Sequence, residues 1–112
     1  LYLMDTPTFS PESITSMIAA GAQIVLFTTG QGNPYGSALA PTIKVSANPD
    51  TTARLGEQID FDASRVVSGE TTSDALAPAL HALVLEIAGG AMTWSEAAGE
   101  TAESISRLEG SV

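Results

Sequence analysis

The sequence predicts a small Rossmann-like α/β domain, in which helices flank a mostly parallel sheet of about four strands in three layers. Two runs that predict strands, residues 1–4 and 23–27, enclose a segment that carries helix signals. The second run shows no alternation of apolar and polar residues, which indicates burial on both faces, as in a parallel sheet. The length of 112 residues suits one α/β domain that spans residues 1–112.

The segment between the two runs predicts a helix that begins at residue 10. Ser10 can cap it, Pro11 fits its first position, and Glu12 complements its dipole. Gly21 is placed to end the helix in the left-handed conformation. The order strand, helix, strand over residues 1–27 therefore predicts a right-handed βαβ unit.

Further elements are predicted after a loop rich in Gly, Pro, Thr, Ser and Asn. They are a strand at 41–46, a helix at 51–58, a strand at 59–61, a helical turn at 63–67, a helix at 72–88 and a short helix at 94–98. Pro78 lies inside the longest of these helices. It indicates either that the regular helix starts near Pro78 or that its first turns are irregular.

Composition and charge exclude several classes of partner. The net charge is −9, with only four Lys and Arg residues, so neither nucleic acid nor an anionic membrane is an expected partner. The chain has no cysteine and one histidine, which excludes disulfides, thiolate metal sites and a histidine-rich metal centre. Most acids follow Ala47 and are interpreted as a solvated surface.

The loop that follows residue 27 is the first candidate for a binding site. Gly30 and Gly32 have the first spacing of a dinucleotide fingerprint, but Gly36 misses the third position by one residue. Hydroxyl, amide and backbone groups that could grip a polyhydroxylated or carboxylate ligand come from Thr28, Thr29, Gly30, Asn33 and Ser37. The alternative is a surface loop whose glycines and prolines only shape turns.

Further polar residues follow the ends of the predicted strands. Asp5 follows the first, residues 46–48 follow the third, and Asp62 follows the fourth. If all strands are parallel, these groups meet Thr28 and Thr29 at one edge, where α/β proteins bind ligands. Asp60 and Asp62 could also share one strand face and hold a divalent cation, or they could be helix caps and solvated carboxylates.

Lys44 is the one basic residue among the first 53 and is the candidate catalytic residue. If its side chain faces the ligand-binding edge of the sheet, it could bind a substrate carboxylate or carry a proton with a pKa lowered by burial. The alternative is an ordinary surface lysine whose ammonium group reaches the solvent.

Several motifs in order resemble one enzyme family along nearly the whole chain. They are MDTP at 4–7, MIAAGAQ at 17–23, FTTGQGNP at 27–34, PTIKV at 41–45, IDFDA at 59–63 and GETT at 69–72. Together they resemble the C-terminal region of the altronate and galactarate dehydratase family, which also includes sulfolactate sulfo-lyase. The chain departs from the family pattern at Gln31, often Arg in the family, and at 62–64, often Asn-Ala-Gly.

The resemblance implies a cytoplasmic lyase that removes water from a sugar acid, or sulfite from a related 2-hydroxy acid. It also implies a divalent, iron-type metal whose ligands lie outside this chain, and several hundred residues in all. The chain, which begins at Leu1 rather than Met, is then expected to be a C-terminal fragment that folds without turning over substrate. Its partner would be an upstream catalytic domain or a partner subunit, and a homo-oligomer is a further option.

The rival hypothesis is a non-catalytic α/β module. In that case the loop would contact a neighbouring domain or subunit and serve assembly. A small-molecule-binding module is a third option, with the same loop as its binding surface.

Overall fold

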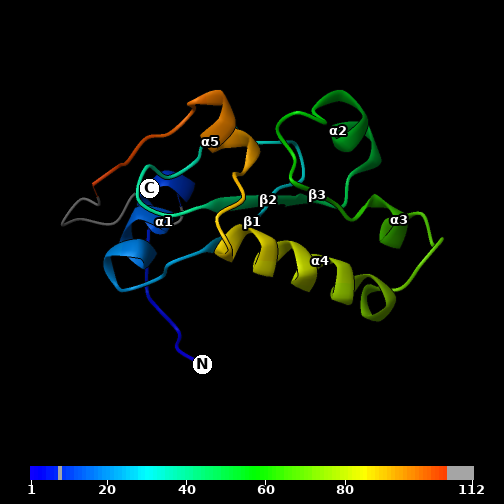
Figure 1. Ribbon diagram of the computed structural model, residues 1–112, viewed down its shortest axis with the longest axis horizontal. Helices are drawn as coiled ribbons and strands as arrows, with labels where there is room; N and C mark the ends of the chain where they lie inside the picture. Colours follow the sequence, from blue (N-terminus) through cyan, green and yellow to red (C-terminus); the bar gives the residue numbers. More distant parts are fainter. Residues whose placement is uncertain (8, 106–112) are drawn as a thin grey trace.

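The computed structural model describes residues 1–7 and 9–105, which form a three-stranded parallel sheet with flanking helices (Figure 1). The strands are β1 (Val25–Thr28), β2 (Thr42–Ser46) and β3 (Phe61–Asp62), in the order β1-β2-β3. Val25 pairs with Thr42, and Val45 pairs with Phe61, both in parallel register. The predicted α/β class is confirmed, with three strands in place of about four in the described residues.

Five helices surround the sheet in the described part of the chain. They are α1 (Ser10–Ala19), α2 (Pro49–Arg54), α3 (Ser64–Val67), α4 (Ser73–Ala88) and α5 (Trp94–Ala98). Of these helices, none is long and apolar enough to span a membrane.

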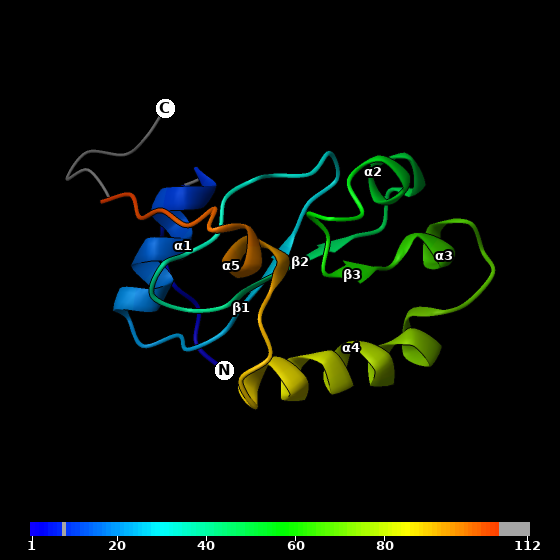
Figure 2. The same ribbon diagram turned by 45° about the horizontal axis from the view of Figure 1, so that its top comes forward.

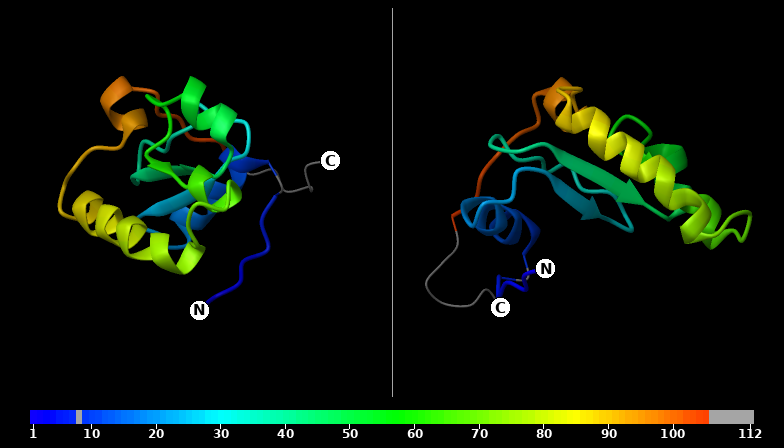
Figure 3. Two further views of the ribbon diagram at one scale, coloured as in Figure 1. Left: turned by 90° about the vertical axis from the view of Figure 1, so that its right-hand side faces the viewer. Right: turned by 60° about the horizontal axis from the view of Figure 1, so that its bottom comes forward.

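Two small cores lie on opposite faces of the sheet. Because Val25 and its neighbour Leu26 pair with Thr42 and Ile43, the side chains of Val25 and Ile43 point to opposite faces. On one face the buried residues are Ile14 of α1, Val25 and Tyr35; on the other they are Ile43, Val45 and Ile87 of α4. Figure 3 shows α1 and α4 on the two sides of the strands.

The prediction of a first strand at residues 1–4 is wrong. These four apolar residues have no strand partner among the described residues, and Leu1, Tyr2 and Leu3 are almost fully exposed. A strand forms only where a neighbour accepts its backbone hydrogen bonds, and this run does not lie on the free edge of β1. The predicted βαβ unit therefore keeps its helix and second strand but not its first strand.

Two helices differ from the sequence-based prediction for local reasons. Helix α2 begins at Pro49 rather than Thr51, because Asn48 Oδ1 accepts hydrogen bonds from the backbone N–H groups of Asp50 and Thr51. Helix α4 is regular from Ser73 and contains Pro78, so neither predicted irregularity occurs. Because Pro78 has no N–H, one carbonyl in the first turn of the helix lacks its usual hydrogen-bond donor.

The loop between β1 and β2 packs closely on α5 at Gly36. A Cβ atom added to Gly36 would lie 2.5 Å from Ser95 Oγ and 2.6 Å from Ser95 Cβ. The carbonyl of Gly36 also accepts a hydrogen bond of 2.9 Å from the backbone N–H of Ala102. Only glycine lets the loop and the C-terminal segment approach this closely.

We therefore expect Gly36→Ala to lower the free energy of unfolding by about 1 to 3 kcal/mol, because the new methyl group overlaps Ser95. The matched control is Gly30→Ala, since a Cβ there meets no atom within 4 Å. Chemical denaturation of the three proteins measures the effect. Equal stability of both variants would contradict the close approach.

Candidate functional site

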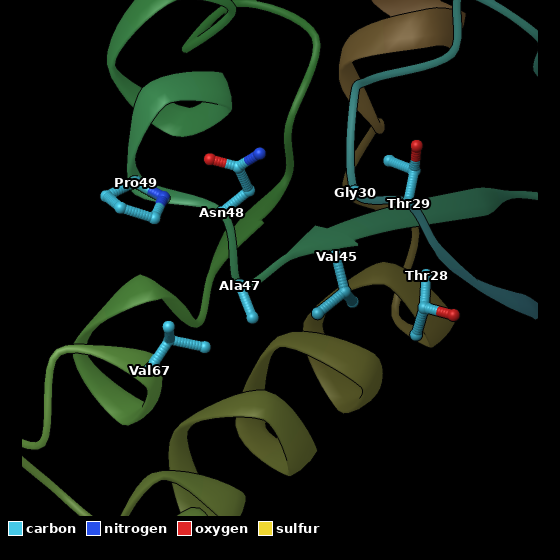
Figure 4. Close-up of a pocket in the computed structure, with 8 residues that line it drawn as sticks. All are labelled: Thr28, Thr29, Gly30, Val45, Ala47, Asn48, Pro49 and Val67. Atoms are coloured by element: carbon cyan, nitrogen blue, oxygen red, sulfur yellow. The ribbon is translucent and has the colours of Figure 1, made fainter.

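An open cleft of about 550 Å³ lies at the carboxyl ends of β1 and β2 (Figure 4). It is lined by Thr28, Thr29, Gly30, Val45, Ala47, Asn48, Pro49 and Val67. The parallel directions of all three strands, on which the predicted convergence depended, are confirmed. The cleft therefore occupies the edge where α/β sheets bind ligands.

Backbone hydrogen bonds hold the rim of the cleft in place. The N–H of Thr29 donates to the carbonyl of Val45 at 2.9 Å, which extends the pairing of the two strands. Thr29 Oγ1 accepts from the N–H of Gly32 at 3.1 Å, and Thr51 Oγ1 donates to the carbonyl of Gly30 at 2.8 Å. The start of the loop is thus fixed both to itself and to α2.

Asn48 brings an amide to the opposite rim. Its Oδ1 caps α2, and in Figure 4 its Nδ2 lies on the side of Thr29 and Gly30. Thr28 adds a hydroxyl group that forms no hydrogen bond within the described residues. The cleft thus has apolar walls and a few polar groups, a combination that orients a small ligand.

The other predicted binding residues do not line the cleft. Asn33 Oδ1 accepts from the N–H of Tyr35 at 2.9 Å, and Ser37 is buried further along the loop. Asp62 ends β3 at the same edge, but its carboxylate accepts from the N–H of Ser64 at the start of α3. The hydrogen bonds from Ser64 lower the pKa of Asp62. The roles of Asn33, Ser37 and Asp62 in binding stay predictions.

Asp5 does not line the cleft. Figures 1 and 2 show the N-terminal segment beside α1, at the end of the molecule away from α2 and α3. The structure therefore brings together Thr28, Thr29 and Gly30 but does not bring Asp5 to them. The reason is the missing first strand, whose end was to place Asp5 at the common edge.

Lys44 is fully buried under the loop, so the alternative of a surface lysine is wrong. Its Nζ donates to the carbonyls of Asn33 at 3.2 Å and Pro34 at 3.4 Å. Burial lowers the pKa of the ammonium group, and the carboxylates of Asp60 and Glu100 partly oppose this shift. These contacts hold the loop, and a role of Lys44 in proton transfer stays a prediction.

The described carboxylates do not form a metal site. Asp60 accepts from the backbone N–H of Lys44 at 2.7 Å and of Trp94 at 2.8 Å, while Asp62 accepts from the backbone N–H of Ser64. Across residues 1–7 and 9–105, no three acidic or histidine side chains gather as metal ligands would. The described residues thus do not fit the divalent metal that the family resemblance implies.

Sequence reasoning missed a cluster around Glu103, which ties the C-terminal segment to α1 and to the loop. The Glu103 carboxylate accepts from the Thr15 hydroxyl at 2.6 Å, from the Ala38 N–H at 2.9 Å and from the Ser37 hydroxyl. Partial burial opposes its ionisation, but these hydrogen bonds outweigh burial and lower its pKa. No pattern in the sequence joins residues this far apart.

Comparison with known proteins places this domain in a family. A family model described as D-galactarate/altronate dehydratase, C-terminal, matches residues 1–110. The beta subunit of (2R)-sulfolactate sulfo-lyase from Chromohalobacter salexigens is 35% identical over 108 residues, which cover 96% of this chain and 28% of that protein. Altronate dehydratase from Escherichia coli is 33% identical over 96 residues, or 86% of this chain and 19% of the relative.

Galactarate dehydratase (L-threo-forming) from the same bacterium is 32% identical over 76 residues, which cover 68% of this chain and 14% of the relative. The resemblance inferred from the motifs is therefore confirmed. The chain spans less than a third of the length of each of these relatives.

The buried ammonium of Lys44 predicts a specific pH dependence of stability. Its folded-state pKa lies below the ordinary 10.5, so between these two values the unfolded chain binds more protons. The free energy of unfolding of the wild type should therefore rise, relative to Lys44→Met, as pH increases through this window. Denaturation at a series of alkaline pH values measures the difference, and a constant difference would contradict the burial of the charge.

Glu103 predicts a pH dependence of stability in the acid range. Its folded-state pKa lies below the ordinary 4.5, so its contribution is present above that value and is lost as pH falls through the folded pKa. Glu103→Gln should remove this part of the acid sensitivity. Acid denaturation compared with the control Glu57→Gln, an exposed residue outside the cluster, tests it. Identical acid profiles of the wild type and Glu103→Gln would rule out the cluster.

Proposed function

Because the chain belongs to the family of C-terminal domains of D-galactarate and altronate dehydratases, we propose that it forms one wall of the substrate site of a lyase. The whole enzyme would remove water from a sugar acid or sulfite from a related 2-hydroxy acid. The observation that carries the proposal is the cleft at the carboxyl ends of β1 and β2.

The chemistry of such an elimination requires groups that orient the substrate. A base takes the proton from the carbon next to the carboxylate, and the leaving group departs from the neighbouring carbon with a proton. The resulting enol then becomes a 2-keto acid. The hydroxyls of Thr28 and Thr29 and the amide of Asn48 are suited to hold substrate hydroxyl groups during this step. The apolar side chains of Val45 and Val67 would exclude water beside them.

The cleft lining contains no acid, histidine or lysine, so it offers no base for the proton. We propose that the base, and the divalent metal of the family, belong to another domain of the same polypeptide or to a partner subunit. That metal would stabilise the charge on the enolate. The isolated chain would then fold without turning over substrate.

An assembly module is the second candidate, because one part of the surface is uncovered. Leu26 of β1 is 51% exposed, and β1 is an edge strand with no partner on its outer side in the described residues. Exposed apolar side chains at residues 1–4 form a separate uncovered area. Such a surface suits contact with another domain, and it is compatible with a wall of the substrate site elsewhere on the chain.

Thr28→Val in the intact polypeptide that carries this chain should lower kcat/KM for the sugar acid it dehydrates by about tenfold, the worth of one lost hydrogen bond. The melting temperature should not change, because the Thr28 hydroxyl makes no hydrogen bond within the described chain. Steady-state kinetics with altronate, galactarate and sulfolactate measure the effect.

Thr101→Val is the matched control, since Thr101 is exposed and does not line the cleft. It should leave kcat/KM unchanged. If Thr28→Val retains full kcat/KM but the protein loses its oligomeric state, the assembly candidate replaces the lyase wall.

A further inference from the structure

A second hollow adjoins the cleft, and its lining is mostly polar. It has a volume of about 550 Å³ and is lined by Gln31, Asn48, Asp50, Thr51, Ala53 and Arg54. Asn48 lines both hollows, and Gln31 directly follows Gly30 of the cleft. A ligand that extends beyond the cleft at this point therefore meets amide, carboxylate and guanidinium groups.

Arg54 gives this hollow a cation with unused donors. Its Nε donates to the carbonyl of Asp50 at 3.3 Å, which directs the side chain back along α2. Within residues 1–7 and 9–105, its terminal nitrogens form no ion pair or hydrogen bond. The Gln31 amide likewise has no hydrogen-bond partner among these residues.

The other cationic side chains in the described part of the chain are engaged elsewhere. Lys44 is completely buried under the loop, and Arg65 pairs with Glu70 at 3.4 Å. On a chain with a net charge of −9, an anion is repelled from most of the surface and needs a local positive group. Among the described residues, Arg54 is the cation that lines the second hollow, which shares Asn48 with the cleft.

We propose that this hollow is a carboxylate subsite, in which Arg54 binds the carboxylate of a hydroxylated acid. The planar guanidinium can donate two parallel hydrogen bonds to a carboxylate. Asp50 lines the same hollow. Its own carboxylate repels the carboxylate of the ligand but can accept hydrogen bonds from the hydroxyl groups of the ligand. The amides of Gln31 and Asn48 complete a set suited to a polyhydroxylated acid.

This inference rests on the proposed function, because it assigns the cleft to the rest of the same acid. It accounts for how a domain without any cation in the cleft lining can still select an acid over a neutral sugar. The selectivity for an acid then comes from the guanidinium of Arg54 in the adjoining hollow rather than from the apolar walls of the cleft.

Calorimetric titration of the intact polypeptide with D-gluconate and D-glucitol tests the subsite, since these probes differ in the carboxylate. Arg54→Gln should weaken gluconate binding about tenfold or more and leave glucitol binding unchanged. The control Arg65→Gln should alter neither. Unchanged gluconate affinity in Arg54→Gln, equal loss for both probes, or no gluconate binding by the wild type would each overturn the proposal.

Kinetics of the same variants separate this inference from the proposed function. If Arg54→Gln weakens gluconate binding but the intact polypeptide eliminates neither water nor sulfite from any acid, the lyase proposal fails and the subsite stands. If elimination proceeds and Arg54→Gln changes neither the KM for the acid nor gluconate affinity, the lyase stands and the subsite is wrong.

Discussion

The buried ammonium of Lys44 is the interaction on which the candidate site depends. The long loop between β1 and β2 contains few large apolar side chains, so it cannot hold its shape by burial alone. Lys44 reaches from the middle of β2 to two loop carbonyls and converts the rigid strand into a support for the loop. Its desolvation is costly, and nearby carboxylates of Asp60 and Glu100 offset part of that cost.

Strand β2 connects this support to the cleft. Successive residues of a strand point to opposite faces, so Lys44 holds the loop on one side while Val45 lines the cleft on the other. Thr29 extends the pairing by one bond to the carbonyl of Val45, which ties the rim of the cleft to the same strand. The position of the cleft is therefore set by backbone pairing, and the lysine anchors the part of the loop that continues from the rim of the cleft.

The sequence predicted the features that depend on local patterns. The unbroken apolar run before Thr28 indicated a parallel strand, which is confirmed, but its predicted burial on both faces is wrong, because β1 is an edge strand and Leu26 is 51% exposed. The small polar residues after the run indicated the edge at which the cleft lies. It did not predict that residues 1–4 lie unpaired, because an apolar run does not show whether a neighbouring strand accepts it. Nor did it predict the contacts of Lys44 and Glu103, since these join residues through the fold rather than through spacing.

Charge counting excluded nucleic acid as an expected partner, but it did not reveal what the acids do. Asp60, Asp62 and Glu103 each accept hydrogen bonds from backbone N–H groups, so part of the negative charge serves to fix loops and helix ends. None of the three lines the cleft. A strongly acidic domain can therefore present a cleft without a carboxylate to an anionic ligand, because its acids act as structural acceptors at other places in the fold.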